Sequence, residues 1–338
     1  MSLSIAPLAA TAPPPVEEAE KPKAKDPNVV LELEARPGEW SGAHANAPTG
    51  SSGIWGDATH VFAAGNGVIL HSADRGAHWQ KARGPTDYPT VWGASIDDVW
   101  VGGGTVVRST DRGATWTPVG PPLGNVYGLW GSGPDDVWAV GGSPAFVAHT
   151  TTKGASWTPV RLPGRPLDWG YDVSGAGNDV WIVGKRRNPT HIESAIFFSK
   201  DRGKTFTEVT APKPGMTPNE QSRKVCGAPS GVVHVAMSYS LWSTRDKGKT
   251  WKLATTVGTE VLSLACRDKQ VVVGGRNHAL FESLDDGASF RAVDLEQPLG
   301  GKLVSAQAAF IAPGGELYIG MESYDAQKGA GTLLRRAP

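Results

Sequence analysis

A repeated eight-residue pattern, Ser/Thr-x-Asp-x-Gly-x-x-Trp/Phe, constrains the fold of this 338-residue chain more than any other feature. Five copies match the pattern, and a sixth, at residues 150–157, has threonine where the others have aspartate. Successive copies begin 37 to 49 residues apart, at positions 72, 109, 150, 199, 244 and 283. Repeats of this length each form one supersecondary unit, and such units bury their apolar faces against one another.

Each copy of the pattern has the residues of a tight hairpin turn. The aspartate can accept hydrogen bonds from backbone N–H groups a few residues further on, and glycine adopts the positive φ that a Cβ atom penalises. The aromatic residue begins the next strand and offers a large apolar face to a neighbouring sheet. We therefore interpret the repeated aspartates as structural and not as catalytic.

A second pattern precedes the turns. Trp-Gly at positions 92–93 and 130–131 is followed by Asp-Asp-Val-Trp at positions 97–100 and 135–138. Weaker copies occupy residues 54–63 and 173–184. The pattern predicts a short apolar strand, a polar turn and a second strand, so we place the paired aspartates in a turn and not in an acid–base couple. Together with the hairpin turn, each unit has four strands.

Four-stranded units of about 40 residues arranged radially are typical of a β-propeller. After the sixth turn we predict three more strands, at residues 308–312, 316–320 and 332–336. We expect residues 29–35 to supply the outer strand beside residues 332–336, because an open sheet edge would invite aggregation. The sequence thus predicts an all-β fold, a seven-bladed β-propeller of four-stranded antiparallel blades whose ring is closed by an N-terminal strand.

The first residues have a different composition. Residues 11–26 are rich in proline, alanine, glutamate and lysine, and such a segment cannot bury enough apolar area to offset the entropy of ordering. We therefore predict a disordered leader or tether at residues 1–27 and the propeller at residues 28–338. The N-terminus lacks the basic and apolar regions of a signal peptide.

The repeated turns resemble those of the Asp-box (BNR repeat) propellers, which include sialidases, xyloglucanases, sortilin-type receptors and photosystem II assembly factors. The resemblance covers residues 29–338, and it informs the fold far more than the function. The Asp-Asp-Val-Trp repeat also resembles secreted or lipid-anchored propellers of social soil bacteria, which implies an exported bacterial protein (periplasmic, cell-surface or secreted). In length and blade number the chain resembles the photosystem assembly factors, which implies a binding scaffold.

Composition argues against several classes of function. Lys+Arg and Asp+Glu are equal, at 33 each, so no net charge attracts nucleic acid or an anionic membrane. No apolar stretch approaches the length of a membrane span. The eight histidines and two cysteines have no chelating spacing, and no phosphate-binding loop is present. We therefore predict no metal, no cofactor, no nucleic-acid partner and a monomeric chain.

The two cysteines, Cys226 and Cys266, fall at nearly equivalent positions in adjacent units. That adjacency would permit a disulfide if the Cα atoms lay within about 7 Å of each other. Because neighbouring inner strands diverge, we instead expect two buried free thiols.

In a propeller of this strand order, the loops that precede the first strand and those between the second and third strands share one mouth of the central channel. A concave mouth lined by loops is the default place for a ligand. The ligand-binding residues predicted there are Tyr88, Tyr127, Trp169, Tyr171, Asp172, Arg186, Arg187, Arg223, Tyr239, Arg276, His278 and Tyr324, together with the acidic residues Glu220, Glu260 and Glu322.

Residues 185–191 form an expanded basic loop at this mouth, with three consecutive cations. A hairpin does not need that length, so we expect Arg186 and Arg187 to anchor an anionic group, with Trp169 and Tyr171 as a stacking surface. The alternative is a solvated insertion without a partner.

The function predicted from these features is a non-catalytic binding or scaffolding propeller that engages a protein or a glycan at the mouth. The alternative is a sialidase-like hydrolase, or a lectin, that uses the same face. Arg187, Arg223 and Arg276 would then form an arginine triad, and Tyr239 would pair with Glu220 or Glu260 as nucleophile. The Arg-Ile-Pro motif that opens the sialidases is missing from the first unit, and the xyloglucanases use two propellers, so enzymatic activity is the second choice.

Overall fold

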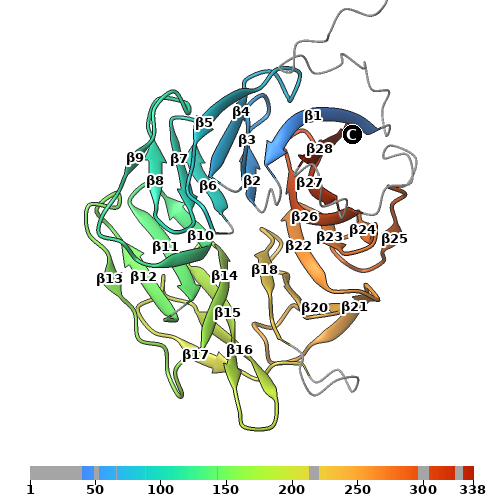
Figure 1. Cartoon of the computed structure of the whole chain (residues 1–338). Coiled ribbons are helices and arrows are strands. Elements are labelled where there is room, and N and C mark those ends of the chain that lie inside the picture. The colour runs from blue at the N-terminus through green and yellow to red at the C-terminus, as the bar shows by residue number, and fades with distance from the viewer. Residues whose placement is uncertain are drawn as a thin grey trace, which may run out of the picture.

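The computed structural model describes residues 40–48, 53–65, 67–87, 89–142, 144–212, 221–295, 304–323 and 330–338. These residues form 28 β-strands and no helix, which confirms the predicted all-β fold (Figure 1). The strands pair antiparallel in four-stranded units, which we call blades. A single pair, Gly142 with Trp169, joins the third and fourth blades into one larger sheet.

Within a blade the strands follow one another outward from the ring axis, so the first strand of each blade is the innermost. The first blade consists of β2 (Gly53–Gly56), β3 (Val61–Gly65), β4 (Val68–Ser72) and β5 (Gln80–Arg83), and the second of β6 (Thr90–Ser95), β7 (Asp98–Gly102), β8 (Val107–Ser109) and β9 (Thr117–Pro118). The third blade consists of β10 (Asn125–Gly133), β11 (Asp136–Gly142), β12 (Phe146–Thr150) and β13 (Thr158–Pro159). The fourth blade consists of β14 (Trp169–Ala176), β15 (Asp179–Arg187), β16 (Ile192–Ser199) and β17 (Thr207–Val209). The next two consist of β18 (Lys224–Gly227), β19 (Val233–Ala236), β20 (Ser240–Thr244) and β21 (Lys252–Thr256); and β22 (Val261–Arg267), β23 (Gln270–Gly275), β24 (Leu280–Ser283) and β25 (Arg291–Ala292).

The last sheet combines the two ends of the described chain. It contains β26 (Val304–Ile311), β27 (Leu317–Ser323) and β28 (Ala330–Arg336), and β1 (Trp40–Pro48) is its outer strand. The innermost strands contact one another in succession, and β26 contacts β2, so the sheets surround a central channel (Figure 1).

The prediction for the closing strand is wrong in its position. β1 pairs with β28 from Trp40 opposite Arg336 to Pro48 opposite Ala330, and β27 takes the other edge of β28. Both edges of β28 are therefore filled, and residues 29–35 lie outside the described residues. The apolar residues of 29–35 favoured that segment in the sequence, but β1 occupies the edge of β28. Chain continuity favours β1, because only residues 49–52 separate it from β2.

The repeated turns have the structural role that the sequence predicts. In the second blade, Asp111 Oδ1 accepts hydrogen bonds from the hydroxyl of Ser109 (2.8 Å) and the backbone N–H of Thr115 (2.9 Å). The backbone has positive φ at Arg112 (59°) and at Gly113 (82°). In the copy without aspartate, the Thr152 hydroxyl takes over, accepting the backbone N–H of Ser156 at 2.9 Å, which explains why that copy can keep the turn.

Each turn also packs against the preceding blade. A Cβ atom added at Gly113 would come within 2.6 Å of the Phe62 ring, and Trp116 meets that ring edge-on with centroids 5.9 Å apart. Gly203 packs on Trp138 in the same way two blades further on. The glycine and the aromatic of the repeat therefore join neighbouring blades as well as closing the hairpin.

The paired aspartates are engaged in ion pairs. Asp97 Oδ1 lies 2.8 Å from Arg112 Nε, and Asp98 Oδ1 lies 2.6 Å from Arg108 Nε. Both arginines belong to the same blade as the aspartates, which agrees with a structural role for the Asp-Asp pairs.

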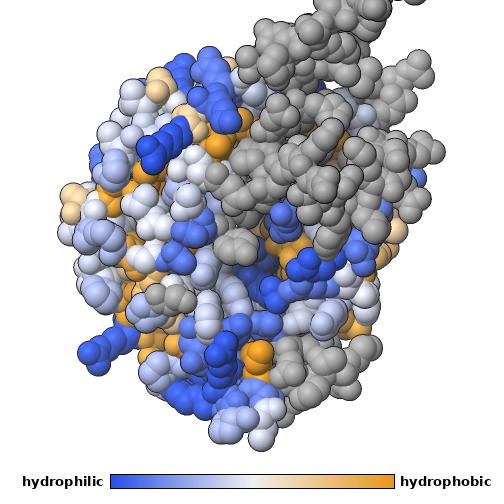
Figure 2. Space-filling view, viewed as in Figure 1, coloured by the Kyte–Doolittle hydropathy of each residue, from blue (hydrophilic) through white to orange (hydrophobic). Residues whose placement is uncertain are grey.

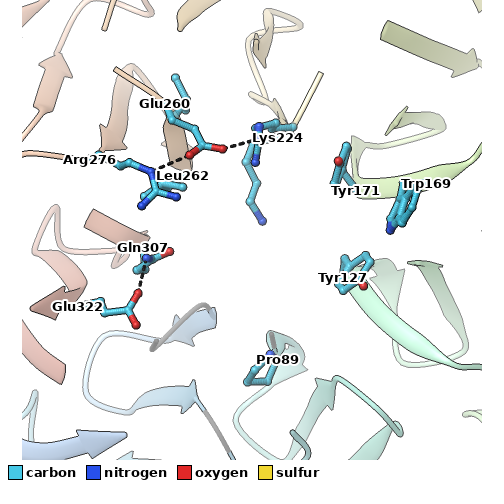
Figure 3. Close-up of a pocket in the computed structure, with 12 residues that line it drawn as sticks. Pro89, Tyr127, Trp169, Tyr171, Lys224, Glu260, Leu262, Arg276, Gln307 and Glu322 are labelled. Carbon is cyan, nitrogen blue, oxygen red and sulfur yellow. Dashed lines mark hydrogen bonds and ion pairs between the residues drawn. The ribbon is translucent and has the colours of Figure 1, made fainter. Parts of the chain in front are cut away.

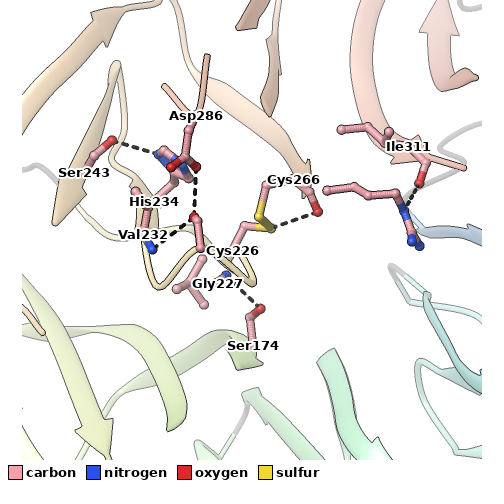
Figure 4. The surroundings of a disulfide bond; sticks show 12 residues. Ser174, Cys226, Gly227, Val232, His234, Ser243, Cys266, Asp286 and Ile311 are labelled. Carbon is pink, nitrogen blue, oxygen red and sulfur yellow. Dashed lines mark hydrogen bonds between the residues drawn. A yellow bond between two sulfur atoms is a disulfide. The ribbon is translucent and has the colours of Figure 1, made fainter. Parts of the chain in front are cut away.

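The expectation of two free thiols is wrong. Cys226 on β18 and Cys266 on β22 form a disulfide with their Cα atoms 6.0 Å apart (Figure 4). Adjacent blades diverge with distance from the ring axis. β18 and β22 are the innermost strands of their blades, so they lie side by side. The bridge links the fifth blade to the sixth.

Candidate functional site

A cavity of about 410 Å³ lies at one mouth of the channel, where the innermost strands begin. Figure 3 shows its residues converging from several blades, and Figure 2 shows hydrophilic side chains gathered around the centre of the ring on the face that it presents. The cavity is lined by Pro89, Tyr127, Trp169, Tyr171, Arg223, Lys224, Glu260, Val261, Leu262, Arg276, Gln307 and Glu322.

Five of the predicted ligand-binding residues are brought together in this cavity, along with the acidic residues Glu260 and Glu322. They are Tyr127, Trp169, Tyr171, Arg223 and Arg276. The sequence did not predict the other lining residues, which are Pro89, Lys224, Val261, Leu262 and Gln307. Lys224 could have been predicted, because it directly follows the predicted Arg223 on the chain, at the start of an inner strand.

Other predicted residues lie elsewhere. Tyr239 is 44% exposed in the turn between β19 and β20 and does not line the cavity. His278 lies in the turn before β24, where it has φ 62° and its backbone N–H donates to the Val304 carbonyl. Tyr88, Glu220 and Tyr324 fall outside the described residues.

Asp172 lines a second chamber of about 140 Å³ in the channel, and Lys224 and Gln307 line both this chamber and the mouth cavity. The Asp172 carboxylate accepts the backbone N–H groups of Val173 (3.0 Å) and Val225 (3.1 Å). Burial raises the pKa of Asp172, and the charge of Lys224 and these two N–H groups oppose that shift. Asp172 is thus a channel residue below the mouth.

The basic segment is a strand rather than a loop. β15 continues to Arg187, which pairs with Ile192 on β16, so only residues 188–191 form the turn. Side chains alternate along a strand, and Arg186 therefore points away from its two basic neighbours. Arg186 is buried, with its guanidinium 2.5 Å from Glu208 and 2.8 Å from the Arg165 carbonyl. The structure therefore places Arg186 away from the mouth cavity, where the sequence predicted it to anchor an anionic group.

The opposite side of β15 carries Lys185 and Arg187 onto the aromatic wall of the cavity. The Lys185 ammonium lies 4.6 Å from the ring centroid of Trp169 and 5.3 Å from that of Tyr171. Arg187 lies 4.9 Å from the Trp169 centroid, and Arg223 lies 5.8 Å from that of Tyr171. Cations and rings therefore alternate, and we call these five side chains the cation–aromatic ladder.

Positive charge is concentrated along the ladder. Burial lowers the pKa of Lys185, and the nearby charges of Arg187 and Arg223 lower it further, whereas Asp168 acts in the opposite direction. A cation whose pKa is lowered by other cations lies in a region of positive potential.

The opposite wall of the cavity consists of paired charges. Glu260 accepts from two arginines, with Oε1 2.5 Å from Arg223 and Oε2 2.6 Å from Arg276. Next to this cluster, the Gln307 side-chain amide donates to Glu322 at 2.7 Å (Figure 3). One carboxylate is thus shared by both arginines that the sequence predicted here.

The nucleophile pair of a sialidase-like site is not assembled in the described residues, because Tyr239 lies outside the cavity that contains Glu260. Tyr171 does line the cavity, but its hydroxyl donates to Gln221 at 2.8 Å and burial raises its pKa to about 12. Such a phenol is a weaker nucleophile at neutral pH.

Among the described residues, no cluster of three or more His, Cys, Asp or Glu side chains could hold a metal ion. Nor does that part of the chain contain a helix long and apolar enough to span a membrane.

Four-stranded antiparallel sheets around a channel, with a cavity at the mouth, define this chain as a β-propeller. It is similar to a solved structure of YCF48 bound to D1 peptide, with 16% identity, TM-score 0.63, and coverage of 90% of this chain and 98% of that chain. It is also similar to YCF48 from Cyanidioschyzon merolae, with 16% identity, TM-score 0.64, and coverage of 88% and 98%. The extracellular domain of BT4673 from B. thetaiotaomicron gives 13% identity and TM-score 0.64, covering 91% of this chain and 39% of that chain.

At these identities the likeness shows the fold alone. No family model matches the chain, and no curated protein matches it either.

Proposed function

We propose that this chain is a non-catalytic binding propeller that holds a segment of a partner protein in the mouth cavity. The observation that carries the proposal is the cavity itself, which combines an aromatic wall with ordered charged groups at the open end of the channel. Ligand sites in proteins are concave and have a few convergent polar groups, as this one has. A similar propeller, YCF48, has been solved with a peptide bound.

A peptide fits the aromatic wall better than a neutral glycan does. A neutral sugar ring would need an open aromatic face to pack on. Here Lys185 and Arg187 lie over the Trp169 ring, and Lys185 and Arg223 lie over the Tyr171 ring. A peptide can instead use main-chain hydrogen bonds and side-chain charges at the rim.

We further propose that the protein works outside the reducing cytosol, as a monomer. Disulfides persist in oxidising compartments, and the Cys226–Cys266 bridge supports export. Native protein that is unfolded without reductant should have no thiol that reacts with an alkylating agent. Two reactive thiols in protein purified from its natural compartment would overturn the export proposal.

Selection from an unbiased peptide display library tests the binding function. The full chain should enrich peptides that lose affinity when Tyr127 or Tyr171 is replaced by alanine. Tyr239→Ala is the matched control, because this tyrosine is exposed near the mouth without lining the cavity. Enriched peptides that are insensitive to both cavity variants, or glycans bound where no peptide is, would contradict the proposal.

A further inference from the structure

Three cations around the cavity have no ion pair with a carboxylate among the described residues. They are Lys185, Arg187 and Lys224. Asp172 and Asp168 lie close enough to influence them, but Asp172 is held by backbone N–H groups and Asp168 accepts the backbone N–H of Arg187 at 2.6 Å. Donor groups at the mouth therefore exceed the acceptors that the described chain supplies.

The cation–aromatic ladder also holds Lys185 and Arg187 in place before any ligand arrives. Long basic side chains lose rotamer freedom when they bind, and that loss weakens the affinity. Stacking on Trp169 and Tyr171 restricts Lys185 and Arg187 in advance. A preorganised pair of cations at a cavity rim is suited to carboxylates.

Glu260 shows how a carboxylate fits on the far wall. Its two oxygens bind Arg223 and Arg276 at 2.5 Å and 2.6 Å, so one internal carboxylate occupies donors that face the cavity. A carboxylate on a ligand would have to share those donors with Glu260, whose charge also repels it.

We propose that the mouth cavity selects an acidic segment of the partner, and that Glu260 limits the affinity by competing for the two arginines. This inference rests on the proposed peptide-binding function and deepens it. Lys185 and Arg187 receive acidic side chains at the rim, Lys224 offers a further donor deeper in the cavity, and Glu260 acts as an internal competitor at Arg223 and Arg276.

The test uses a short synthetic peptide that alternates glutamate with alanine, and a matched peptide with glutamine in place of each glutamate. Titration calorimetry on the full chain should show binding of the acidic peptide alone, weaker at higher salt because exposed charges are screened. Lys185→Met and Arg187→Met should each weaken binding by about tenfold, the effect of losing one charge-assisted contact. Arg112→Met is the control, because this exposed arginine lies on a repeated turn and pairs with Asp97.

Glu260→Gln gives the opposite sign, and we expect it to tighten binding of the acidic peptide several-fold. A glutamine peptide that binds equally well, or a Glu260→Gln protein that binds the acidic peptide more weakly while keeping its unfolding midpoint, would overturn the inference. If Glu260→Gln does not fold, the two surface variants on β15 decide the question. Display-selected peptides that bind the cavity without acidic residues would refute this inference and leave the proposed function standing, whereas a sulfated glycan bound in place of any peptide would refute both.

Discussion

The structure describes all six copies of the repeated turn. In five of them the same hydrogen bonds join the serine or threonine to the aspartate and to the glycine. These roles could be predicted from sequence because they depend on neighbours within eight residues. The contacts of the glycine with the preceding blade could not, since they join residues a whole repeat apart.

Gly113→Val tests the two requirements on that glycine, its positive φ and its close packing against the preceding blade. Valine at φ 82° is strained, and its Cβ would meet the Phe62 ring at 2.6 Å, so we expect a loss of about 2–4 kcal/mol in the free energy of unfolding. Gly133→Val is the matched control, because nothing lies within 4 Å of its Cβ position. Denaturant unfolding measures both, and equal losses would contradict the packing role of Gly113.

Arg186 and Arg187 are adjacent in sequence, but we expect their substitutions by alanine to lower the free energy of unfolding by different amounts. Arg186→Ala removes the partner of Glu208 inside the protein, and we expect it to cost about 1–3 kcal/mol, reduced by the partial exposure of Glu208. Arg187→Ala should change the unfolding free energy by no more than about 0.5 kcal/mol, since that side chain is exposed. If the two losses were reversed in thermal or denaturant unfolding, the register of β15 would be wrong.

His234 is a buried titratable residue in the position that Trp138 occupies two blades earlier. Its ring is fully buried and lies 2.7 Å from the Ser243 hydroxyl through Nδ1, and Nε2 has no hydrogen-bond partner among the described residues. Burial lowers its pKa from 6.5 to about 4, although Asp286 opposes the shift. The unfolded chain therefore binds a proton more readily than the folded one does.

Stability from this histidine is fully present above pH 6.5 and is lost as the pH falls toward 4, by up to about 3 kcal/mol. His71, whose pKa burial also lowers to about 4, adds a loss of the same sign. His234→Phe should flatten the fall in unfolding free energy between pH 6.5 and 4. An unchanged pH profile for the variant would show that His234 is not charged on unfolding.

At the scale of strands, most elements could be predicted because an alternating stretch bounded by glycine or aspartate is a local signal. Two elements could not be predicted. The extension of β15 to Arg187 turns Arg186 away from the cavity and leaves Lys185 and Arg187 facing it, and the sequence offers no turn residue that fixes the end of this strand before residue 188. The closing strand depends on a pairing between the two ends of the chain, and the more apolar candidate, residues 29–35, was the wrong one.

Removing β1 should expose the outer edge of β28. We expect a chain that begins at residue 53 to aggregate or to unfold at a much lower temperature, because unpaired strand edges associate. A chain that begins at residue 40 keeps β1 and is the control. Light scattering and the unfolding midpoint distinguish the two, and equal behaviour would show that β1 does not stabilise the last sheet.

At the scale of the whole molecule, the ring brings to one mouth residues that lie far apart in sequence. Tyr127, Trp169, Tyr171, Arg223 and Arg276 were predicted to meet because each stands near the start of an inner strand or in a mouth loop. Their partners were not predictable: the stacking of Lys185 on Trp169 and the sharing of Glu260 depend on side-chain direction. The Cys226–Cys266 bridge likewise depends on the distance of two strands from the ring axis.

A crystal structure of the full chain with a peptide selected from an unbiased library tests whether the mouth cavity binds the partner. We predict that the peptide lies in the mouth cavity, in contact with Tyr127 and Tyr171. A peptide bound on the face of the repeated turns or along an outer strand, with the mouth cavity empty, would contradict the proposed binding site.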